Sequence, residues 1–202
     1  MIQAGKKANA LCHPVILDPA GAGASSYRNE ITERLLNEIH FTVIKGNISE
    51  IKYIASKTSS TSGVDANIND LVSDDNIKEV INFSKQLSKQ TGAIIAISGA
   101  IDIVCDENHA YIIKNGHQMM SKITGTGCML TGVIATYVAS NTQDLLKATA
   151  CAICMMGLSG EIAYQKIMNE HKGTSSFRTY LIDTISMMDD KILEGGMKIE
   201  IQ

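Results

Sequence analysis

Short apolar runs alternate along the chain with longer segments of helical spacing. Mainly apolar runs predict buried strands at 15–17, 41–44 and 93–97. A segment with helical spacing follows the first run over 28–38, and another precedes the third over 75–90. Short buried strands separated by helices are typical of an α/β fold, in which helices cover both faces of parallel strands.

The rest of the chain adds further elements to this pattern. Residues 1–12 resemble the end of a helix that His13-Pro14 terminates, because proline cannot continue a helix. Residues 56–73 are rich in Ser, Thr, Asn and Asp, and predict a loop. Apolar runs at 102–105 and 109–113 predict an antiparallel hairpin. The last part of the chain predicts a helix at Cys128, helices near 144–168 and 174–193, and a strand within 195–202.

Composition argues against several function classes. The chain has 202 residues, which suggests one domain or a little more. Its net charge of −3 and its lack of a basic run argue against a nucleic-acid partner. No apolar stretch reaches the ~18 residues that a membrane span needs, and no secretory signal is visible after Met1. We therefore expect a cytoplasmic protein with neither a nucleic-acid nor a membrane partner.

The cysteines and histidines predict no metal centre. Five cysteines, an odd number with irregular spacing, favour reduced thiols in a cytosolic protein over a disulfide framework. Cys151 and Cys154 have C-x-x-C spacing but lie in an apolar helical pattern, so we expect them in the core. None of the five histidines has a partner at metal-ligand spacing, and we expect surface or turn positions for them.

The stretch Gly125-Thr126-Gly127-Cys128 predicts a glycine-rich turn that opens a buried helix. Glycine lets the backbone approach a ligand closely, because it has no Cβ. Free N–H groups and the positive end of the helix dipole favour an anion at this place, so the four residues form a candidate anion hole. A cysteine there gains thiolate character. Taken alone, the stretch fits a tight turn before a core helix equally well.

Polar and small residues also follow the predicted strands. Asp18 with a glycine-rich loop follows the first strand, Lys45 the second and Ser98-Gly99 the third. Ligands of α/β sheets bind beyond the carboxyl ends of the strands. Asn47 and Glu50 would share one face of a helical turn. Their oxygens suit magnesium held through water, and they also suit a variant of the capping box; spacing alone favours neither hypothesis, and both can be true.

These features together favour phosphoryl transfer. A carboxylate, a cation, a hydroxyl and an oxyanion turn are the parts this chemistry needs, because the protein mainly positions groups and stabilises charge. The chain contains no G-x-x-x-x-G-K-[ST] pattern, so it is not a P-loop enzyme, and no dinucleotide fingerprint follows a strand.

On these residues the chain resembles the hydroxyethylthiazole kinases, the thiamine-salvage branch of the ribokinase-like enzymes. The likeness covers nearly all of the chain. Cys128 is its specific mark, because most ribokinase-like enzymes have there an aspartate that takes the proton of the acceptor hydroxyl. The residues that carry the likeness are Asp18-Pro19-Ala20-Gly21-Ala22-Gly23-Ala24, Lys45-Gly46-Asn47-Ile48-Ser49-Glu50, Ser98-Gly99-Ala100-Ile101-Asp102, Asn115-Gly116-His117 and Thr124-Gly125-Thr126-Gly127-Cys128.

The resemblance implies a ribokinase-like three-layer α/β sandwich, with helices on both faces of a mostly parallel sheet. It implies a kinase that uses ATP and Mg²⁺ to phosphorylate the primary hydroxyl of 4-methyl-5-(2-hydroxyethyl)thiazole. By the same resemblance, Cys128 would lie next to that hydroxyl, and Gly125 would contact the substrate. Asp18 and Glu50 would be the carboxylates around magnesium.

The nucleotide would bind to three other residues. Lys45 falls where the family usually has an arginine on the ATP phosphates; lysine keeps the charge but loses the bidentate fork. Ser98 matches a hydroxyl that the family places on the nucleotide, and Asn47 is expected beside it.

The family also has a substantial part before the equivalent of Met1, including its first βα units. We therefore expect residues 1–202 to be a single, N-terminally incomplete kinase domain, and an intact protein to pair further strands with 15–17. Family members form trimers with active sites between subunits, so we expect a homotrimer. Two alternatives stay open. The first is an impaired fragment that only binds nucleotide or oligomerises. The second is another ribokinase-like enzyme, either a small-alcohol kinase or a hydrate dehydratase, and Cys128 disfavours this second alternative.

Overall fold

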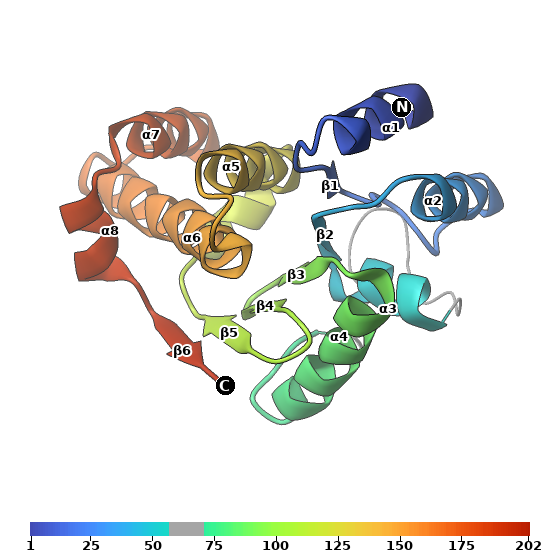
Figure 1. Cartoon of the computed structure of the whole chain (residues 1–202). Helices are drawn as coiled ribbons and strands as arrows, with labels where there is room; N and C mark the ends of the chain where they lie inside the picture. The colour runs from blue at the N-terminus through green and yellow to red at the C-terminus, as the bar shows by residue number, and fades with distance from the viewer. Residues whose placement is uncertain (57–70) are drawn as a thin grey trace.

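The short apolar runs form the strands of one sheet. The computed structural model describes residues 1–56 and 71–202, and in these residues six strands pair in the order β1-β2-β3-β4-β5-β6 (Figure 1). Most of the loop predicted at 56–73 lies outside the described residues. The strands are β1 (Ile16–Leu17), β2 (Val43–Asn47), β3 (Ile94–Ser98), β4 (Asp102–Cys105), β5 (Ala110–Ile113) and β6 (Ile199–Ile201).

The sheet is parallel on one side and antiparallel on the other. β1, β2 and β3 are parallel, with Ile16 beside Val43 and Val43 beside Ile94. β4 and β5 form the predicted hairpin and pair antiparallel, as do β3 with β4 and β5 with β6. The expectation of a mostly parallel sheet therefore holds for β1 to β3 and is corrected for β4 to β6. Short connections reverse the chain between β3, β4 and β5, and β6 returns antiparallel to β5 after α5 to α8.

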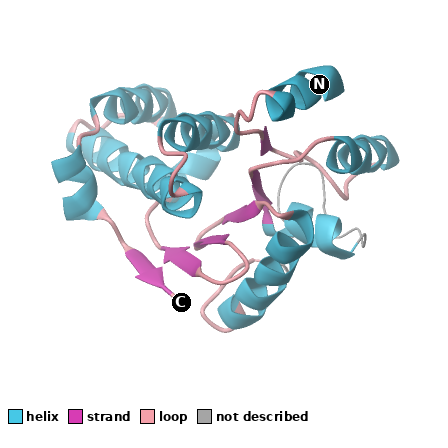
Figure 2. Ribbon diagram, in the orientation of Figure 1, coloured by secondary structure: helices cyan, strands magenta, loops and turns pink. Residues whose placement is uncertain are grey.

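Helices cover both faces of this sheet (Figure 2). On one face lie α5, α6, α7 and α8, and on the other lie α2, α3 and α4, with α1 beside α2. The bounds are α1 (Ile2–Ala10), α2 (Ser26–Glu38), α3 (Ile48–Ser56), α4 (Ile77–Thr91), α5 (Thr126–Ser140), α6 (Leu145–Asn169), α7 (Thr174–Met187) and α8 (Asp190–Gly196); a short 3₁₀ helix, η2 (Gln118–Lys122), precedes α5.

Alternation along the strands divides the core into two layers. On β3, Ile94 and Ala96 pack with α5 to α8, whereas Ile95 and Ile97 pack with α2 to α4. Because successive strand residues point to opposite faces, an unbroken apolar run is needed to fill both layers. This is the three-layer arrangement that the sequence predicts.

The helices predicted at 28–38 and 75–90 are confirmed as α2 and α4. The single helix predicted at 174–193 is wrong, because the chain forms α7 and then α8. The break has a local cause: Asp189 adopts an extended conformation, and its carboxylate accepts a hydrogen bond of 2.8 Å from the N–H of Ile192, which starts a new helix.

The sequence predicted a buried helix that begins near Cys128. This helix, α5, lies at the surface instead. Only one face of α5 is buried, with Leu130, Ile134 and Val138 at four-residue spacing. The helix that is enclosed instead is α6, which packs against α5, α7 and the sheet. In the part of the chain that the structure describes, α6 is the one helix long and apolar enough to cross a membrane, and 67% of its most apolar window is buried inside the molecule.

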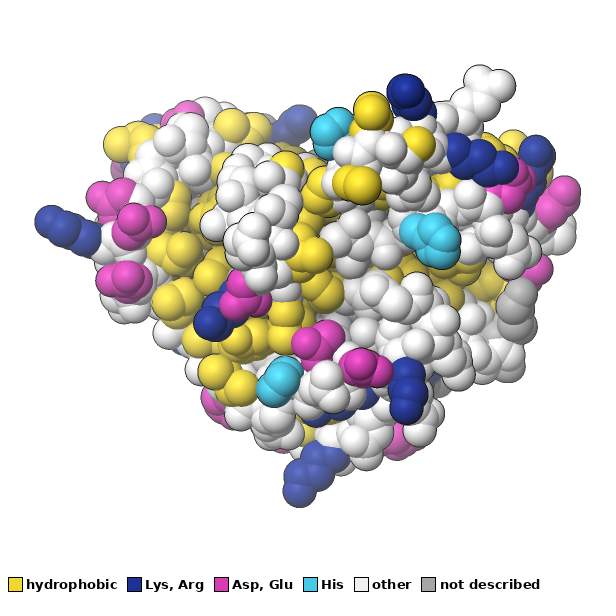
Figure 3. All heavy atoms as spheres, viewed as in Figure 1, with side chains coloured by type: hydrophobic (Ala, Val, Ile, Leu, Met, Phe, Trp, Pro, Cys, Tyr) yellow, Lys and Arg dark blue, Asp and Glu magenta, His cyan; other side chains and the backbone are white. Residues whose placement is uncertain are grey.

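The surface carries mixed charge. In Figure 3, acidic and basic side chains are intermingled on this face, and apolar side chains show between the helices around α5 and α6. All five cysteines lie in the described ranges and are free thiols. Cys154 of the C-x-x-C pair is buried in α6, as predicted, whereas Cys151 is only half-buried.

Candidate active site

The loop after β1 folds over the start of α3. Asp18 directly follows β1, and its side chain is 20% exposed. Gly21 adopts a φ of +77°, a conformation that favours glycine. Its N–H thereby donates a hydrogen bond of 2.7 Å to Oε1 of Glu50. The loop that carries Asp18 is thus attached to the beginning of α3 by a buried carboxylate.

Glu50 also closes a capping box with Asn47. The N–H of Asn47 donates to Oε2 of Glu50 at 2.8 Å, and the N–H of Glu50 donates to Oδ1 of Asn47 at 2.9 Å. The capping hypothesis is therefore confirmed. Burial raises the pKa of Glu50, although the amides of Gly21 and Asn47 oppose the shift. Both oxygens of this carboxylate already accept backbone hydrogen bonds.

Lys45 lies within β2 rather than after it. The strand runs three residues beyond the predicted end, because Lys45, Gly46 and Asn47 pair in register with β3. The side chain of Lys45 is only 6% exposed. Its Nζ lies 3.4 Å from Oδ2 of Asp18 and 3.3 Å from the carbonyl oxygen of Gly127, so a buried cation contacts both the β1 end and the glycine turn.

The glycine turn opens α5 as predicted. Gly125 has a φ of +100° and is the N-cap residue, and its carbonyl accepts a hydrogen bond of 2.9 Å from the N–H of Met129. The N–H groups of Thr126, Gly127 and Cys128 donate to no acceptor in the described residues. Free amides at a helix N-terminus favour an anion, so these three remain a candidate anion site. Cys128 is exposed at this turn.

Thr131 joins the cluster, although the sequence analysis did not select it. Its Oγ1 donates to Oδ2 of Asp18 at 2.6 Å and lies 3.1 Å from the carbonyl oxygen of Gly127. Its position three residues after Cys128 puts both side chains on one side of the helix. That spacing was the only signal in the sequence, because a threonine within a helix usually bonds to its own backbone.

Ser98 and Asp102 lie at the carboxyl end of β3. Ser98 pairs in register with Asn47, and its hydroxyl lies 3.4 Å from the carbonyl oxygen of Gly46. The N–H of Gly99 donates to Oδ1 of Asp102 at 2.7 Å. Burial raises the pKa of Asp102 to about 7, against the effects of the Gly99 amide and the Lys45 charge. An aspartate inside an apolar hairpin was the signal that could have marked this residue.

The structure thus joins most of the residues selected from the sequence. Asp18, Lys45 and Gly127 are in direct contact, and Glu50 reaches them through Gly21. Ser98 is linked by strand register to Asn47 rather than by a side-chain contact.

The carboxylates offer limited room for a metal ion. In the ranges that the structure describes, no group of three His, Cys, Asp or Glu side chains is placed to hold one. Both oxygens of Glu50 accept backbone N–H groups, whereas Oδ1 of Asp18 accepts no hydrogen bond from a described residue. Magnesium often keeps several waters and uses one or two carboxylates with substrate phosphates, so Asp18 fits such an ion and Glu50 does not fit as a direct ligand.

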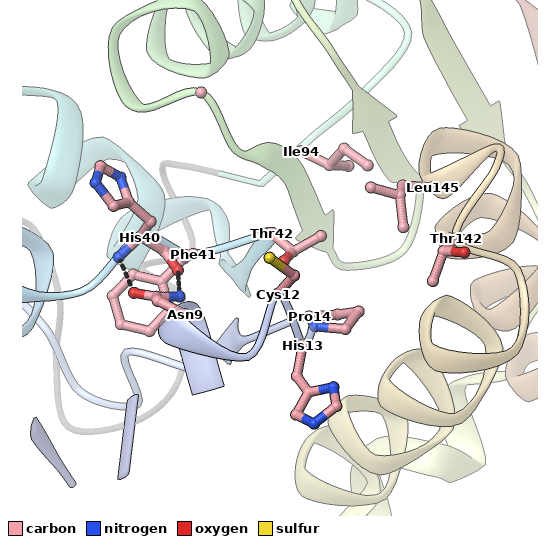
Figure 4. Close-up of a pocket in the computed structure, with 11 residues that line it drawn as sticks. Asn9, Cys12, His13, Pro14, His40, Phe41, Thr42, Ile94, Thr142 and Leu145 are labelled. Atoms are coloured by element: carbon pink, nitrogen blue, oxygen red, sulfur yellow. Dashed lines mark hydrogen bonds between the residues drawn. The ribbon is translucent and has the colours of Figure 1, made fainter. Parts of the chain in front are cut away.

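A cavity of about 530 Å³ lies at the opposite end of the sheet (Figure 4). Its walls come from the segment before β1 and from residues at the amino ends of β2 and β3, among them Cys12, Thr42 and Ile94. The side chain of Asn9 is occupied by two hydrogen bonds with the backbone of His40. Because none of the clustered carboxylates, the lysine or the glycine turn borders this cavity, we place the candidate active site at the carboxyl ends of the strands.

Comparison with known proteins gives one consistent result. The model of the family described as the hydroxyethylthiazole kinase family matches residues 1–191. A hydroxyethylthiazole kinase from Clostridium acetobutylicum is 50% identical over 200 residues, which cover 99% of this chain and 73% of that protein.

Solved structures agree with this result. The structure of a hydroxyethylthiazole kinase protein from Pyrococcus horikoshii OT3 superposes with a TM-score of 0.83 at 27% identity, covering all of this chain and 70% of that one. A pyridoxal kinase from Staphylococcus aureus has a TM-score of 0.53 at 18% identity over 78% of this chain and 55% of its own, and shows the shared ribokinase-like fold alone.

Proposed function

Because the chain belongs to the hydroxyethylthiazole kinase family, we propose that it phosphorylates the primary hydroxyl of 4-methyl-5-(2-hydroxyethyl)thiazole with ATP as co-substrate. The observation that best supports this proposal is the contact between a buried lysine and the glycine turn whose amides are free. The Nζ of Lys45 lies 3.3 Å from the carbonyl oxygen of Gly127. A cation and a helix N-terminus together stabilise the charge of a transferring phosphoryl group.

In the proposed reaction, the hydroxyl oxygen of the alcohol attacks the γ-phosphorus of ATP. The bond from that phosphorus to the β,γ-bridging oxygen breaks and ADP leaves. The hydroxyl proton passes to Sγ of Cys128 as the general base; this side chain is exposed at the turn and can therefore meet a substrate. Gly125 would contact the alcohol, while the amides of Thr126, Gly127 and Cys128 hold the phosphoryl oxygens.

The nucleotide would lie along the carboxyl ends of β2 and β3. We assign Lys45 to its phosphates, and the neighbouring Asn47 and Ser98 to the same ligand. The pairing of Asn47 with Ser98 in strand register supports a shared contact for both.

Magnesium, when bound with ATP, would neutralise phosphate charge in this site. We propose that Asp18 holds its water shell through Oδ1, the oxygen that accepts no hydrogen bond from a described residue. For Glu50 we propose a structural role instead: its carboxylate shapes the Asp18 loop through Gly21.

The test is a kinase assay with the purified chain, ATP and the thiazole alcohol, with the thiazole phosphate identified by mass spectrometry. We expect one thiazole phosphate for each ADP formed. Hydrolysis of ATP without thiazole phosphate would contradict the proposal. We also infer a homotrimer in the cytoplasm; light scattering that gives a monomer or dimer for the active species would contradict the trimer.

A further inference from the structure

One oxygen of Asp18 is shared by two donors from distant parts of the chain. Thr131 Oγ1 approaches Oδ2 to 2.6 Å, whereas Lys45 Nζ approaches the same oxygen only to 3.4 Å. An O–H···O⁻ bond is typically ~2.5–2.7 Å long, so the threonine contact is a charge-assisted hydrogen bond and the lysine contact is a loose ion pair.

The threonine hydroxyl has a single hydrogen and two possible acceptors. The carbonyl oxygen of Gly127 lies 3.1 Å away, at the position that a helical threonine ordinarily uses, whereas Oδ2 of Asp18 lies nearer, at 2.6 Å. The negative charge and the shorter distance favour the carboxylate as acceptor. The bond links residues 113 positions apart in sequence and joins the end of β1 to the first turns of α5.

We propose that Thr131 is a positioning residue of the phosphoryl-transfer site. Its hydroxyl holds Oδ2 of Asp18 against α5, which leaves Oδ1 directed to the substrate side. The same bond fixes the distance between Asp18 and the turn that bears Cys128, three residues away on the same helix. This inference rests on the proposed kinase function.

The hydroxyl also limits the pairing of Lys45 with Asp18. Without it, Lys45 would be the sole donor on Oδ2 among the described residues, and the lysine would close onto the carboxylate. A tight pair would withdraw the cation from the phosphates and turn the carboxylate. Positioning errors of about 1 Å can cost about 100-fold in rate, so loss of one hydroxyl is expected to matter.

The experiment compares Thr131→Val and Thr131→Ser with Thr136→Val in the full chain. Thr136 is the matched control, because its hydroxyl lies 3.0 Å from the carbonyl oxygen of Gly132 on the same helix, and no bond from it to another element is found in the described residues. We expect Thr131→Val to lower kcat by about 10- to 100-fold, with KM for the thiazole alcohol nearly unchanged. Thr131→Ser and Thr136→Val should keep kcat within about threefold of the parent.

A second measurement tests whether Thr131 acts through Asp18. In an Asp18→Asn background, Thr131→Val should lower kcat no further, because the group that it positions is already altered. If Thr131→Val does not fold, Thr131→Ala replaces it, and thermal melting of every variant ensures that only folded protein is compared.

The outcomes separate this inference from the function on which it rests. Equal kcat in Thr131→Val and Thr136→Val, failure of serine to restore kcat, or a full further loss in the Asp18→Asn background would each overturn the positioning role. If the parent chain makes no thiazole phosphate but hydrolyses ATP, the proposed function fails; the same variants assayed on that hydrolysis then decide the role of Thr131 on their own.

Discussion

The substitution Glu50→Gln distinguishes a structural carboxylate from a metal-binding one. Glu50 is only 4% exposed, and its two oxygens accept N–H groups from Gly21 and Asn47 at 2.7 and 2.8 Å. Glutamine has one acceptor oxygen and one NH₂ group, so one of these amides must face a donor. A buried donor left without an acceptor costs about 1–3 kcal/mol.

The raised pKa of Glu50 sets the pH dependence of this loss. Burial holds the pKa of Glu50 in the folded state above the ordinary 4.5. The parent protein therefore loses part of its stability as the pH rises from 4.5 through the folded-state pKa. Glutamine carries no charge and avoids this loss, so the deficit of the variant is larger at pH 4 than at pH 8. A loss of 2 kcal/mol corresponds to roughly 4–8 °C in melting temperature for a chain of this size.

The assay is thermal unfolding at both pH values beside a magnesium titration of the kinase rate. Glu79→Gln is the matched control, since Glu79 stands three residues after Asn76 in the first turn of α4, as Glu50 stands after Asn47, but is exposed. It should change stability by no more than about 0.5 kcal/mol. An unchanged melting temperature for Glu50→Gln, together with a raised magnesium requirement, would refute the structural role.

Three further predictions test other parts of the molecule. Cys128→Ser should lower kcat by about 10²–10⁴-fold with little change in KM for ATP, while Cys128→Asp stays active; normal turnover by the serine variant would exclude Cys128 as the proton acceptor. Gly157→Ala should lower the free energy of unfolding by about 1–3 kcal/mol, because the added Cβ would lie 2.7 Å from the backbone of Asn115. Gly132→Ala should raise the free energy of unfolding, because nothing lies within 4 Å of its added Cβ. Denaturant melts that show the same sign for both variants would contradict this prediction. Burial raises the pKa of Asp102 to about 7, so the parent should lose up to about 4 kcal/mol of unfolding free energy as the pH rises from 4 to 7. Asp102→Asn should not show this loss. Parallel curves of stability against pH for the two proteins would contradict the assignment.

Most of the fold could be predicted from apolar spacing. The strands fill two core layers, so they appear as unbroken apolar runs, and β3 shows this most clearly. The end of β2 could not be predicted in this way, because Lys45, Gly46 and Asn47 are polar or small yet complete the pairing with β3. Their side chains belong to the candidate site, and local rules of composition fail most often at such places.

The position of α5 shows a second limit of the sequence. Its residues are apolar nearly all round, which predicts a buried helix, yet Cys128 and its neighbours at the N-terminus are exposed. Burial depends on which elements pack on each side, and periodicity gives no information about neighbours that are distant in sequence. The break between α7 and α8 was missed for a different reason. Asp189 is of a residue type that often caps helices, but it lay in a continuous helical pattern.

The candidate site was predictable in its residue types but not in its connections. Strand ends and a glycine turn selected Asp18, Lys45 and Cys128, because an α/β sheet brings such segments to one edge. No sequence pattern predicted the hydrogen bond between Thr131 and Asp18. None predicted that both carboxylate oxygens of Glu50 accept hydrogen bonds from backbone amides. These bonds decide which carboxylate can face a metal-bound water and which one holds the loop in place. A substitution at Glu50 should therefore be read first as a change in stability, and one at Asp18 or Thr131 as a change in the geometry of phosphoryl transfer.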